Sequence, residues 1–244
     1  MPRFYALGVL LAATLCSTGL AQEFEEDVIP TSTGDLTITF IGHGTLMFTH
    51  GGRVIHVDPV GQEADYRAMP DADLVLVTHR HGDHLDTEAI ELIATDVTTV
   101  VVSRDCRDAV KGAMILENGE TETVQGFAIE AVPAYNIEHK RDNGQPFHPQ
   151  GDGNGYILTF GDIRVYVAGD TENTPEMKAL ENIDIAFLPM NLPYTMTPEM
   201  VADAARAFRP RILYPYHYGN TDVSQLTALL ADEEGIEVRV RSMQ

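Results

Sequence analysis

Cysteine is scarce in this sequence, and that limits how the fold can be stabilised. The 244 residues include two cysteines, Cys16 and Cys106. Cys16 lies in an apolar N-terminal stretch that we expect to be removed, which would leave Cys106 as the only thiol. One thiol cannot form an internal disulfide bond, even in a compartment that permits them. The core, and any bound metal, must therefore stabilise the protein, and we interpret Cys106 as an ordinary residue.

Basic residues are also few, and their shortage excludes some classes of partner. The chain has 16 Lys and Arg against 37 Asp and Glu, which gives a formal net charge of −21. A field of this sign repels nucleic acid and anionic membrane surfaces. After the N-terminal stretch the densest basic pair is Lys140-Arg141, and no basic cluster offsets the acidity. We therefore expect no nucleic-acid partner, and we interpret the acidity as a means of keeping the protein soluble.

A long apolar run occurs at the N-terminus. Arg3 supplies a positive charge, Phe4 to Leu15 is almost wholly apolar, and small residues precede Ala21. This is the order of a secretory signal peptide. It predicts cleavage after Ala21, so that residues 1–21 are a signal peptide and residues 22–244 form a single domain. The protein is then exported, periplasmic or secreted, without stable membrane insertion. An uncleaved anchor is the alternative, because Phe4 to Ala21 is nearly long enough to span a bilayer.

The rest of the chain has the composition of a soluble globular protein, with 44% hydrophobic and 22% charged residues. Apolar runs bounded by Gly, Pro or Asp indicate strands, and amphipathic segments with capping residues indicate helices. We find no linker between domains. The expected strands are residues 36–41, 46–49, 54–57, 74–78, 99–102, 124–132, 156–160, 163–168, 185–188, 212–214 and 238–240. The expected helices are residues 88–94, 104–111, 174–180, 197–208 and 223–231, and 143–155 is the longest expected loop.

A cluster of histidines follows the apolar run 74–78. The sequence there is His79-Arg80-His81-Gly82-Asp83-His84, which places three imidazoles and a carboxylate within six residues. Imidazole nitrogen and carboxylate oxygen are both ligands for zinc and similar divalent ions. A loop that follows a buried strand is held rigidly at one end, as a metal site requires. A solvated polar loop is the alternative, but three histidines at this spacing favour metal binding.

This His-x-His-x-Asp-His pattern resembles the motif of the metallo-β-lactamase superfamily. Three later landmarks of that family follow in order, namely His148 in Phe-His-Pro, Asp170 in Ala-Gly-Asp-Thr and His217 in Pro-Tyr-His-Tyr. The resemblance runs from about residue 36 to residue 217. It implies an α/β fold, the four-layer αββα sandwich, with the site at one edge of the sheets. Among the branches of the family, the chain is most similar to lactonase-like hydrolases, which include ascorbate-6-phosphate lactonases and uncharacterised metal-dependent hydrolases.

The resemblance also implies a ligand set for two divalent metal ions, most readily Zn²⁺, with Mn²⁺ or Fe²⁺ as alternatives. The first metal would be held by His79, His81 and His148, and the second by Asp83, His84 and His217. Asp170 would bridge the two, since one carboxylate can give an oxygen to each cation. Such a pair of metals can share a hydroxide that attacks the substrate. Asp83 could also orient this water or accept its proton.

Several of these residues have another possible interpretation. Asp170 could be a turn or helix-capping residue, and His217 could simply pack among neighbouring tyrosines. His139 could replace His148 as third ligand of the first metal, although the Phe-His-Pro context favours His148. Two further residues are expected beside the ligands. Asp58 follows a predicted strand, and the resemblance implies that it orients the histidine loop by hydrogen bonding. The resemblance also implies that His43 lies near the site, but His43 fits equally well as a turn residue.

The substrate class is the least constrained expectation. A small-molecule lactone or other ester is favoured, because many true β-lactamases replace or lack the bridging aspartate. The alternatives are a phosphodiesterase or phospholipase D-like hydrolase, a β-lactamase, and a metal-binding protein without catalysis. A tyrosine such as Tyr194 or Tyr218 is a candidate donor to the oxyanion, because each is close in sequence to Asp170 or His217. The sequence predicts no oligomeric state.

Overall fold

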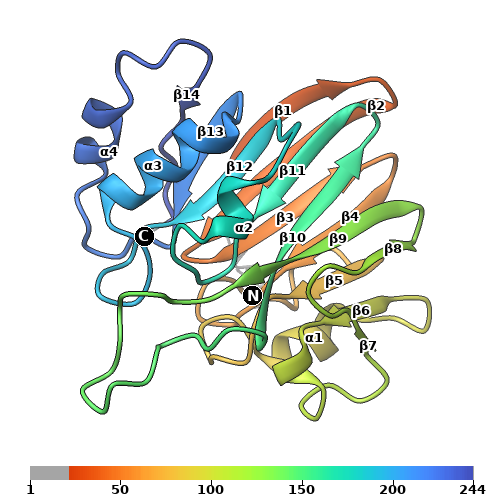
Figure 1. The fold of residues 1–244 in the computed structure, drawn as a ribbon. Helices are drawn as coiled ribbons and strands as arrows, with labels where there is room; N and C mark the ends of the chain where they lie inside the picture. The colour runs from red at the N-terminus through yellow and green to blue at the C-terminus, as the bar shows by residue number, and fades with distance from the viewer. Residues whose placement is uncertain (1–21, 244) are drawn as a thin grey trace, which may run out of the picture.

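The computed structural model describes residues 22–243, and the predicted signal peptide lies outside them. Two seven-stranded sheets make up most of the fold, and Figure 1 shows them layered one against the other. The first sheet contains the N-terminal strands in sequence order. They are β1 (Glu25–Thr31), β2 (Gly34–Gly42), β3 (Thr45–His50), β4 (Arg53–Val57), β5 (Leu74–Val77), β6 (Thr99–Val102) and β7 (Met114–Ile115).

The second sheet contains the remaining strands, again in unbroken sequence order from one edge to the other. A chain that pairs consecutive strands needs few long crossings, which is the usual preference of protein topologies. The strands are β8 (Thr121–Val124), β9 (Phe127–Ala134), β10 (Gly153–Phe160), β11 (Ile163–Val167), β12 (Ile185–Pro189), β13 (Ile212–Tyr216) and β14 (Glu237–Val238).

The core between the sheets follows from the period-two pattern of the strands. On β5, Leu74 and Leu76 belong to the large core that both sheets share, while Val75 and Val77 belong to a second cluster on the opposite face. Both faces of this strand are therefore buried, which explains its continuous apolar sequence. Aromatic rings meet across the shared core, with the ring centroids of Phe40 and Tyr214 5.0 Å apart.

Helices cover the outer faces of both sheets. Helix α1 (Thr87–Ile93) packs Ile90 and Ile93 into the cluster that contains Val75 and Val77. Helices α2 (Pro175–Lys178), α3 (Pro198–Phe208) and α4 (Val223–Leu229) lie on the side of the second sheet (Figure 1), where the ring of Phe208 contacts that of Tyr166. The expected αββα sandwich is confirmed. Within residues 22–243, none of the helices has both the length and the apolar character needed to cross a membrane.

The loops that follow the parallel strands of each sheet lie at one edge of that sheet. Strands β4, β5 and β6 pair in parallel, and so do β11, β12 and β13. The carboxyl ends of parallel strands lie at the same edge of a sheet. The two edges are joined by a hydrogen bond from the amide of Asn154 to the carbonyl of Thr78, 2.8 Å long. The segments after β4, β5, β11 and β13 therefore meet, and they carry the predicted site.

Three local expectations were wrong. The segment 104–111 forms only a 3-10 turn at Arg104–Cys106, because the Ser103 side chain makes no capping hydrogen bond and the segment is too short and polar to bury a helical face. The expected strand 124–132 is a hairpin of β8 and β9, since Gln125 and Gly126 both adopt positive φ and turn the chain. The expected loop 143–155 ends earlier, because Gly153 to Gly155 already pair with β9. The edge strands β1 and β7 were not predicted.

Candidate metal centre

The loop after β5 carries four of the predicted ligands. A short turn bends it, with the amides of His84 and Leu85 both donating to the carbonyl of His81. The loop then enters α1, whose N-cap residue Asp86 accepts hydrogen bonds from the amides of Glu88 and Ala89. A buried strand on one side and a capped helix on the other fix the loop at both ends.

One group of candidate ligand atoms comes from His79, His81, His148 and Asp170. These atoms all lie within 4.8 Å of one another. Nε2 of His79 is 3.0 Å from Nδ1 of His81, and Nε2 of His148 is 3.2 Å from the same atom. Three imidazoles whose nitrogens converge beside a carboxylate make a ligand set that suits zinc and related ions. The structure thus brings together the residues predicted for the first metal.

A second group lies beside the first and shares Asp170 with it. The candidate ligand atoms of His84, Asp170 and His217 lie within 4.8 Å of one another, as do those of His43, Asp83 and His217. Oδ2 of Asp83 is 3.5 Å from Nε2 of His217 and 4.0 Å from Nε2 of His84. The residues predicted for the second metal therefore lie together, and His43 joins them.

Asp170 stands between the two groups and turns one oxygen to each. Its Oδ2 is 3.2 Å from Nε2 of His148 and 3.9 Å from Nε2 of His79. Its Oδ1 is 3.4 Å from Nε2 of His84 and 3.5 Å from Nε2 of His217. A carboxylate placed in this way has one oxygen available for each of two cations.

Buried polar atoms without hydrogen bonds give a test of whether the residues fit a cation. Nε2 of His84, Nε2 of His217 and Oδ1 of Asp170 are buried and make no hydrogen bond. An unsatisfied buried polar atom costs about 1–3 kcal/mol, so such atoms rarely cluster without a reason. A divalent cation between them would satisfy all three, and the donor set fits such an ion.

The electrostatics of the metal-free centre agree with this fit. Burial raises the pKa of Asp170, but His217 and His84 outweigh it and hold that pKa well below its usual range. Burial, together with the neighbouring His84, lowers the pKa of His79 and keeps its imidazole neutral. Burial also lowers the pKa of His84, yet the carboxylates of Asp170 and Asp58 outweigh it and raise that pKa to about 9. A metal ion must therefore displace a proton from His84.

Asp58 occupies the supporting position that its place after β4 predicted. Its fully buried carboxylate lies 2.8 Å from Nδ1 of His84 and accepts hydrogen bonds from the amide and hydroxyl of Thr78. With Nδ1 of His84 engaged in this way, Nε2 is the nitrogen left to face Asp170 and a metal. Orienting partners of this kind set both the tautomer and the ring direction of a ligating histidine.

The choice between His148 and His139 is clear in the geometry. His148 contributes to the first group, whereas His139 belongs to none of the ligand groups found among residues 22–243. Nδ1 of His139 instead lies 2.9 Å from Oε1 of Glu172. Both histidines belong to the long loop between β9 and β10, but the loop folds back so that only His148 reaches Asp170.

Two residues that the sequence analysis missed hold that loop in place. Oδ1 of Asn136 lies 2.8 Å from both the amide nitrogen and Nδ1 of His148. The carboxylate of Glu172, fully buried, accepts hydrogen bonds from the amide of Asn136 and from the backbone N–H groups of Ile137, Glu138 and His139. Glu172 follows Asp170 by two residues, which is a signal that could have been noticed. Nothing in the local sequence distinguishes Asn136.

His43 is both a turn residue and a site residue. It adopts a positive φ of 50° between β2 and β3, as does His217 with a φ of 46°. The two rings lie 3.8 Å apart, and Nε2 of His43 is 3.4 Å from Oδ2 of Asp83. Gly44, also missed, lets this turn approach the centre, because a Cβ there would lie 2.7 Å from Cε1 of His84.

The two tyrosines suggested as oxyanion donors differ in position. Tyr194 lines a hollow beside Asp83, Asp170 and His217. Tyr218 does not line either hollow at the centre, and its hydroxyl donates a hydrogen bond of 2.8 Å to the carbonyl of Arg241. The structure therefore leaves Tyr194 as the candidate and removes Tyr218.

Comparison with known proteins agrees with this arrangement. Residues 37–217 match the model of the beta-lactamase superfamily domain, a span that begins in β2 and ends at the last predicted ligand. The chain belongs to the metallo-β-lactamase superfamily. The matched span includes every residue of both ligand groups.

Relatives of this metallo-β-lactamase superfamily protein are metal-dependent hydrolases, and so is the chain itself. It is 32% identical over 186 residues to a UPF0173 metal-dependent hydrolase of Methanoculleus marisnigri, covering 75% of this chain and 81% of the relative. A UPF0173 metal-dependent hydrolase from Koribacter versatilis is 31% identical over 203 residues, which cover 77% of this chain and 86% of the relative.

Solved structures show the same fold. A structure from Parabacteroides distasonis, described as that of a metal-dependent hydrolase, is 50% identical and superposes with a TM-score of 0.87 over 91% of this chain and 100% of that chain. Igni18 from Ignicoccus hospitalis, a metallo hydrolase, is 22% identical with a TM-score of 0.68, covering 85% of this chain and 95% of that chain, and it supports the fold alone.

Proposed function

We propose that this hydrolase uses two divalent metal ions, most readily Zn²⁺, to open a lactone or cleave another small carboxylic ester. The observation that carries the proposal is the position of Asp170, whose two oxygens face two separate histidine groups. Two bound metals would lower the pKa of a shared water and polarise the substrate carbonyl, which is the chemistry that ester hydrolysis needs.

The residues of the chain would supply orientation and charge for this reaction. The side chain of Asp83 is half exposed, so it lies where the buried centre meets solvent. Burial raises the pKa of Asp83, but the neighbouring imidazoles of His217 and His43 outweigh it and hold that pKa far below its usual range. An ionised Asp83 would serve as a ligand and as an acceptor that orients the attacking water. Tyr194, at the rim of the same hollow, is positioned to donate to the developing oxyanion.

The resemblance to lactonase-like hydrolases and the aspartate at position 170 support the choice of an ester over a β-lactam. The shortage of basic side chains supports it over a phosphodiester, because Arg80 and Arg141 are the only lysines or arginines of residues 22–243 that line the hollows beside the centre. We also propose that the protein acts in an exported form, since its first residues have the order of a signal peptide. N-terminal sequencing of the exported protein would test this, and an intact Met1 would refute it.

Metal-stripped protein reloaded with Zn²⁺ or Mn²⁺ should be assayed on a γ-butyrolactone, a phosphodiester and a β-lactam, with metal content measured in parallel. We expect two metal ions per chain and ring opening of the lactone. Asp170→Asn should reduce both the metal content and the rate, because it removes the charge shared by the two groups. Fast phosphodiester cleavage without lactone opening would overturn the proposed substrate class, and one tightly held metal without any turnover would indicate a binding protein.

A further inference from the structure

Arg141 is the positively charged side chain that both hollows beside the metal centre share. The hollows have volumes of about 290 and 390 Å³, and both are also lined by His81, Phe147, His148 and Asp170. In the second hollow, which contains Asp83, His217 and Tyr194, Arg141 is the only Lys or Arg in the lining. A substrate that reaches the centre through either hollow therefore passes this guanidinium.

The guanidinium of Arg141 has no acidic partner among residues 22–243. Its Cζ lies 5.0 Å from the ring centroid of Phe147, and Nη2 donates a hydrogen bond of 3.3 Å to the carbonyl of that residue. No Asp or Glu of the described chain forms an ion pair with it, whereas arginines elsewhere in this acidic protein, such as Arg239 and Arg241, are paired. A guanidinium has five N–H donors, so most of those on Arg141 remain available to a ligand.

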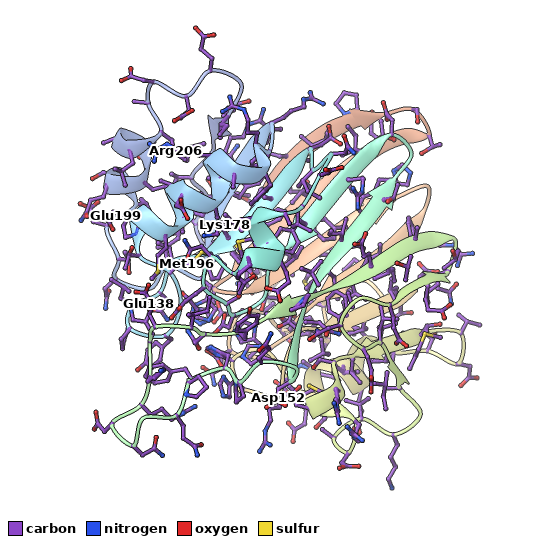
Figure 2. The ribbon with its side chains drawn as sticks, in the orientation of Figure 1. Glu138, Asp152, Lys178, Met196, Glu199 and Arg206 are labelled. Atoms are coloured by element: carbon purple, nitrogen blue, oxygen red, sulfur yellow. The ribbon has the colours of Figure 1, made fainter. Side chains whose placement is uncertain are left out.

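The backbone around Arg141 is fixed. Its amide donates to the carbonyl of Gln145, and its own carbonyl accepts from the amide of Gly144, each at 2.8 Å. Lys140 and Pro146 form a bridge across the base of this turn. The carboxylate of Glu172 accepts a hydrogen bond from the backbone N–H of Glu138, three residues before Arg141. Figure 2 labels Glu138 and Asp152, which lie towards the two ends of the loop between β9 and β10. Arg141 is thus carried by a built turn beside the centre.

Two aromatic rings, those of Phe147 and Tyr194, line the second hollow beside Arg141, and we call this part of the surface the entrance. The ring of Tyr194 meets that of Phe147 edge to face, with centroids 5.0 Å apart, and Phe147 also lies under the Arg141 guanidinium. Tyr194 is 45% exposed to solvent. The entrance therefore offers an apolar aromatic surface with one cation on it.

We propose that the substrate carries a carboxylate beside the ester that is cleaved, and that Arg141 binds this carboxylate while Phe147 and Tyr194 contact the carbon skeleton. The proposal deepens the hydrolase function proposed above and rests on it. A planar guanidinium can bind a carboxylate with two parallel hydrogen bonds. One guanidinium balances one negative charge, whereas a phosphate carries about −1.5 to −2 at neutral pH and would be only partly balanced by it.

The overall charge of the chain gives a local cation a role in holding such a substrate. The chain has a formal net charge of −21, so its average field repels an anion. Beside the proposed metals, a positive side chain close to the centre adds a local attraction for a carboxylate against that field. The protein should therefore bind an ester that carries a carboxylate more tightly than an uncharged ester, which offers the guanidinium no anionic partner.

The test compares ligands that differ by one charge and does not depend on turnover. Binding of glutarate, pentanoate and 4-phosphonobutanoate to the metal-loaded protein is measured by isothermal titration calorimetry. In the proposed arrangement, one carboxylate of each ligand binds the metals, and the second acidic group of glutarate or of the phosphonate binds Arg141. The variants are Arg141→Ala and Lys140→Ala. Lys140 is the matched control, because it is an exposed cation next in sequence that lines neither hollow.

We expect wild-type protein and Lys140→Ala to bind glutarate about tenfold more tightly than pentanoate, and Arg141→Ala to lose this preference. A preference that persists in Arg141→Ala, or that is absent from the wild type, would overturn the proposal. Binding of the phosphonate more tightly than glutarate would overturn the carboxylate assignment. A carboxylate preference in a protein that neither opens a lactone nor cleaves another carboxylic ester would leave the Arg141 site standing and refute the ester substrate.

Discussion

The carboxylate of Asp58 lies 2.8 Å from Nδ1 of His84, although the two residues are 26 positions apart in the sequence. Both side chains are fully buried. Asp58 follows β4 and His84 follows β5, and these strands pair in parallel, so the sheet itself brings the two residues together. The contact selects the nitrogen of His84 that faces Asp170. A candidate ligand is therefore held by a residue that is not itself a candidate ligand.

The first prediction concerns this contact. Asp58→Ala should weaken metal binding about 10–100-fold, because His84 would lose the partner that orients its ring. A chelator competition titration measures the affinity. Asp58→Asn keeps an oxygen acceptor for His84 but loses the charge, so it should weaken metal binding to an intermediate extent. This variant also allows the measurement if the alanine protein does not fold. An unchanged affinity in both variants would show that Asp58 does not orient His84.

The second prediction separates the two histidines of the loop between β9 and β10. His148→Ala should lose one metal ion per chain, because Nε2 of His148 lies 3.2 Å from Oδ2 of Asp170. His139→Ala should keep the wild-type metal content, since His139 lies beside Glu172 instead. Inductively coupled plasma mass spectrometry of both proteins gives the answer. Loss of metal only from His139→Ala would reverse the assignment.

The third prediction concerns the buried carboxylate that anchors the same loop. Glu172→Gln should lower the free energy of unfolding of the metal-free protein by about 1–3 kcal/mol, because three backbone N–H groups lose a charged acceptor. Urea denaturation measures this change. Glu138→Gln is the control, since its exposed side chain should change the free energy by less than about 0.5 kcal/mol. Equal effects of the two substitutions would argue against an anchoring role.

The fourth prediction is a pH dependence at β1, where Asp27 contacts Tyr214, Arg239 and Arg241. Burial raises the pKa of Asp27, but the hydrogen bonds from Arg241 and Tyr214 outweigh it, so the pKa lies below 3.8. A carboxyl with a lowered pKa stabilises the fold above its unfolded pKa, and this contribution is lost as the pH falls through the lower, folded value.

Asp27→Asn should therefore cost about 1 kcal/mol of unfolding free energy at neutral pH, with a difference that shrinks below about pH 4. Urea denaturation of both proteins across this pH range measures the difference. Glu23→Gln, which changes an exposed carboxylate near the same end of the chain, should have little effect at any pH. A difference that is constant with pH would show that the charge of Asp27 is not what stabilises β1.

The ligands differ in how far the sequence could predict them. His79, His81, Asp83 and His84 fall within six residues, so local spacing alone indicated a metal-binding loop. Asp170, His217 and His148 are far from that loop, and only the resemblance to a family connected them. Their convergence, and the two-sided position of Asp170, required the register of two sheets.

Residues that support the ligands were harder to predict. Asp58 was found because it follows a strand, but its partner His84 was not specified. Asn136, Glu172 and Gly44 were missed, since an amide, a second carboxylate or a glycine has many ordinary roles in a sequence. Their function here comes from close approach across segments that are distant in the chain, such as the 2.8 Å contacts between Asn136 and His148.

The sequence by itself determined most of the strands, the longer helices and the histidine loop, because side-chain periodicity and capping act over a few residues. The tertiary structure alone decided that His148 and not His139 reaches Asp170, and that Arg141 lies unpaired at the entrance. These outcomes depend on how the loop between β9 and β10 folds back over the sheet edge. Hydrogen bonds donated by the loop to the side-chain oxygens of Glu172 and Asn136 hold it there, and such long-range contacts leave no local pattern in the sequence.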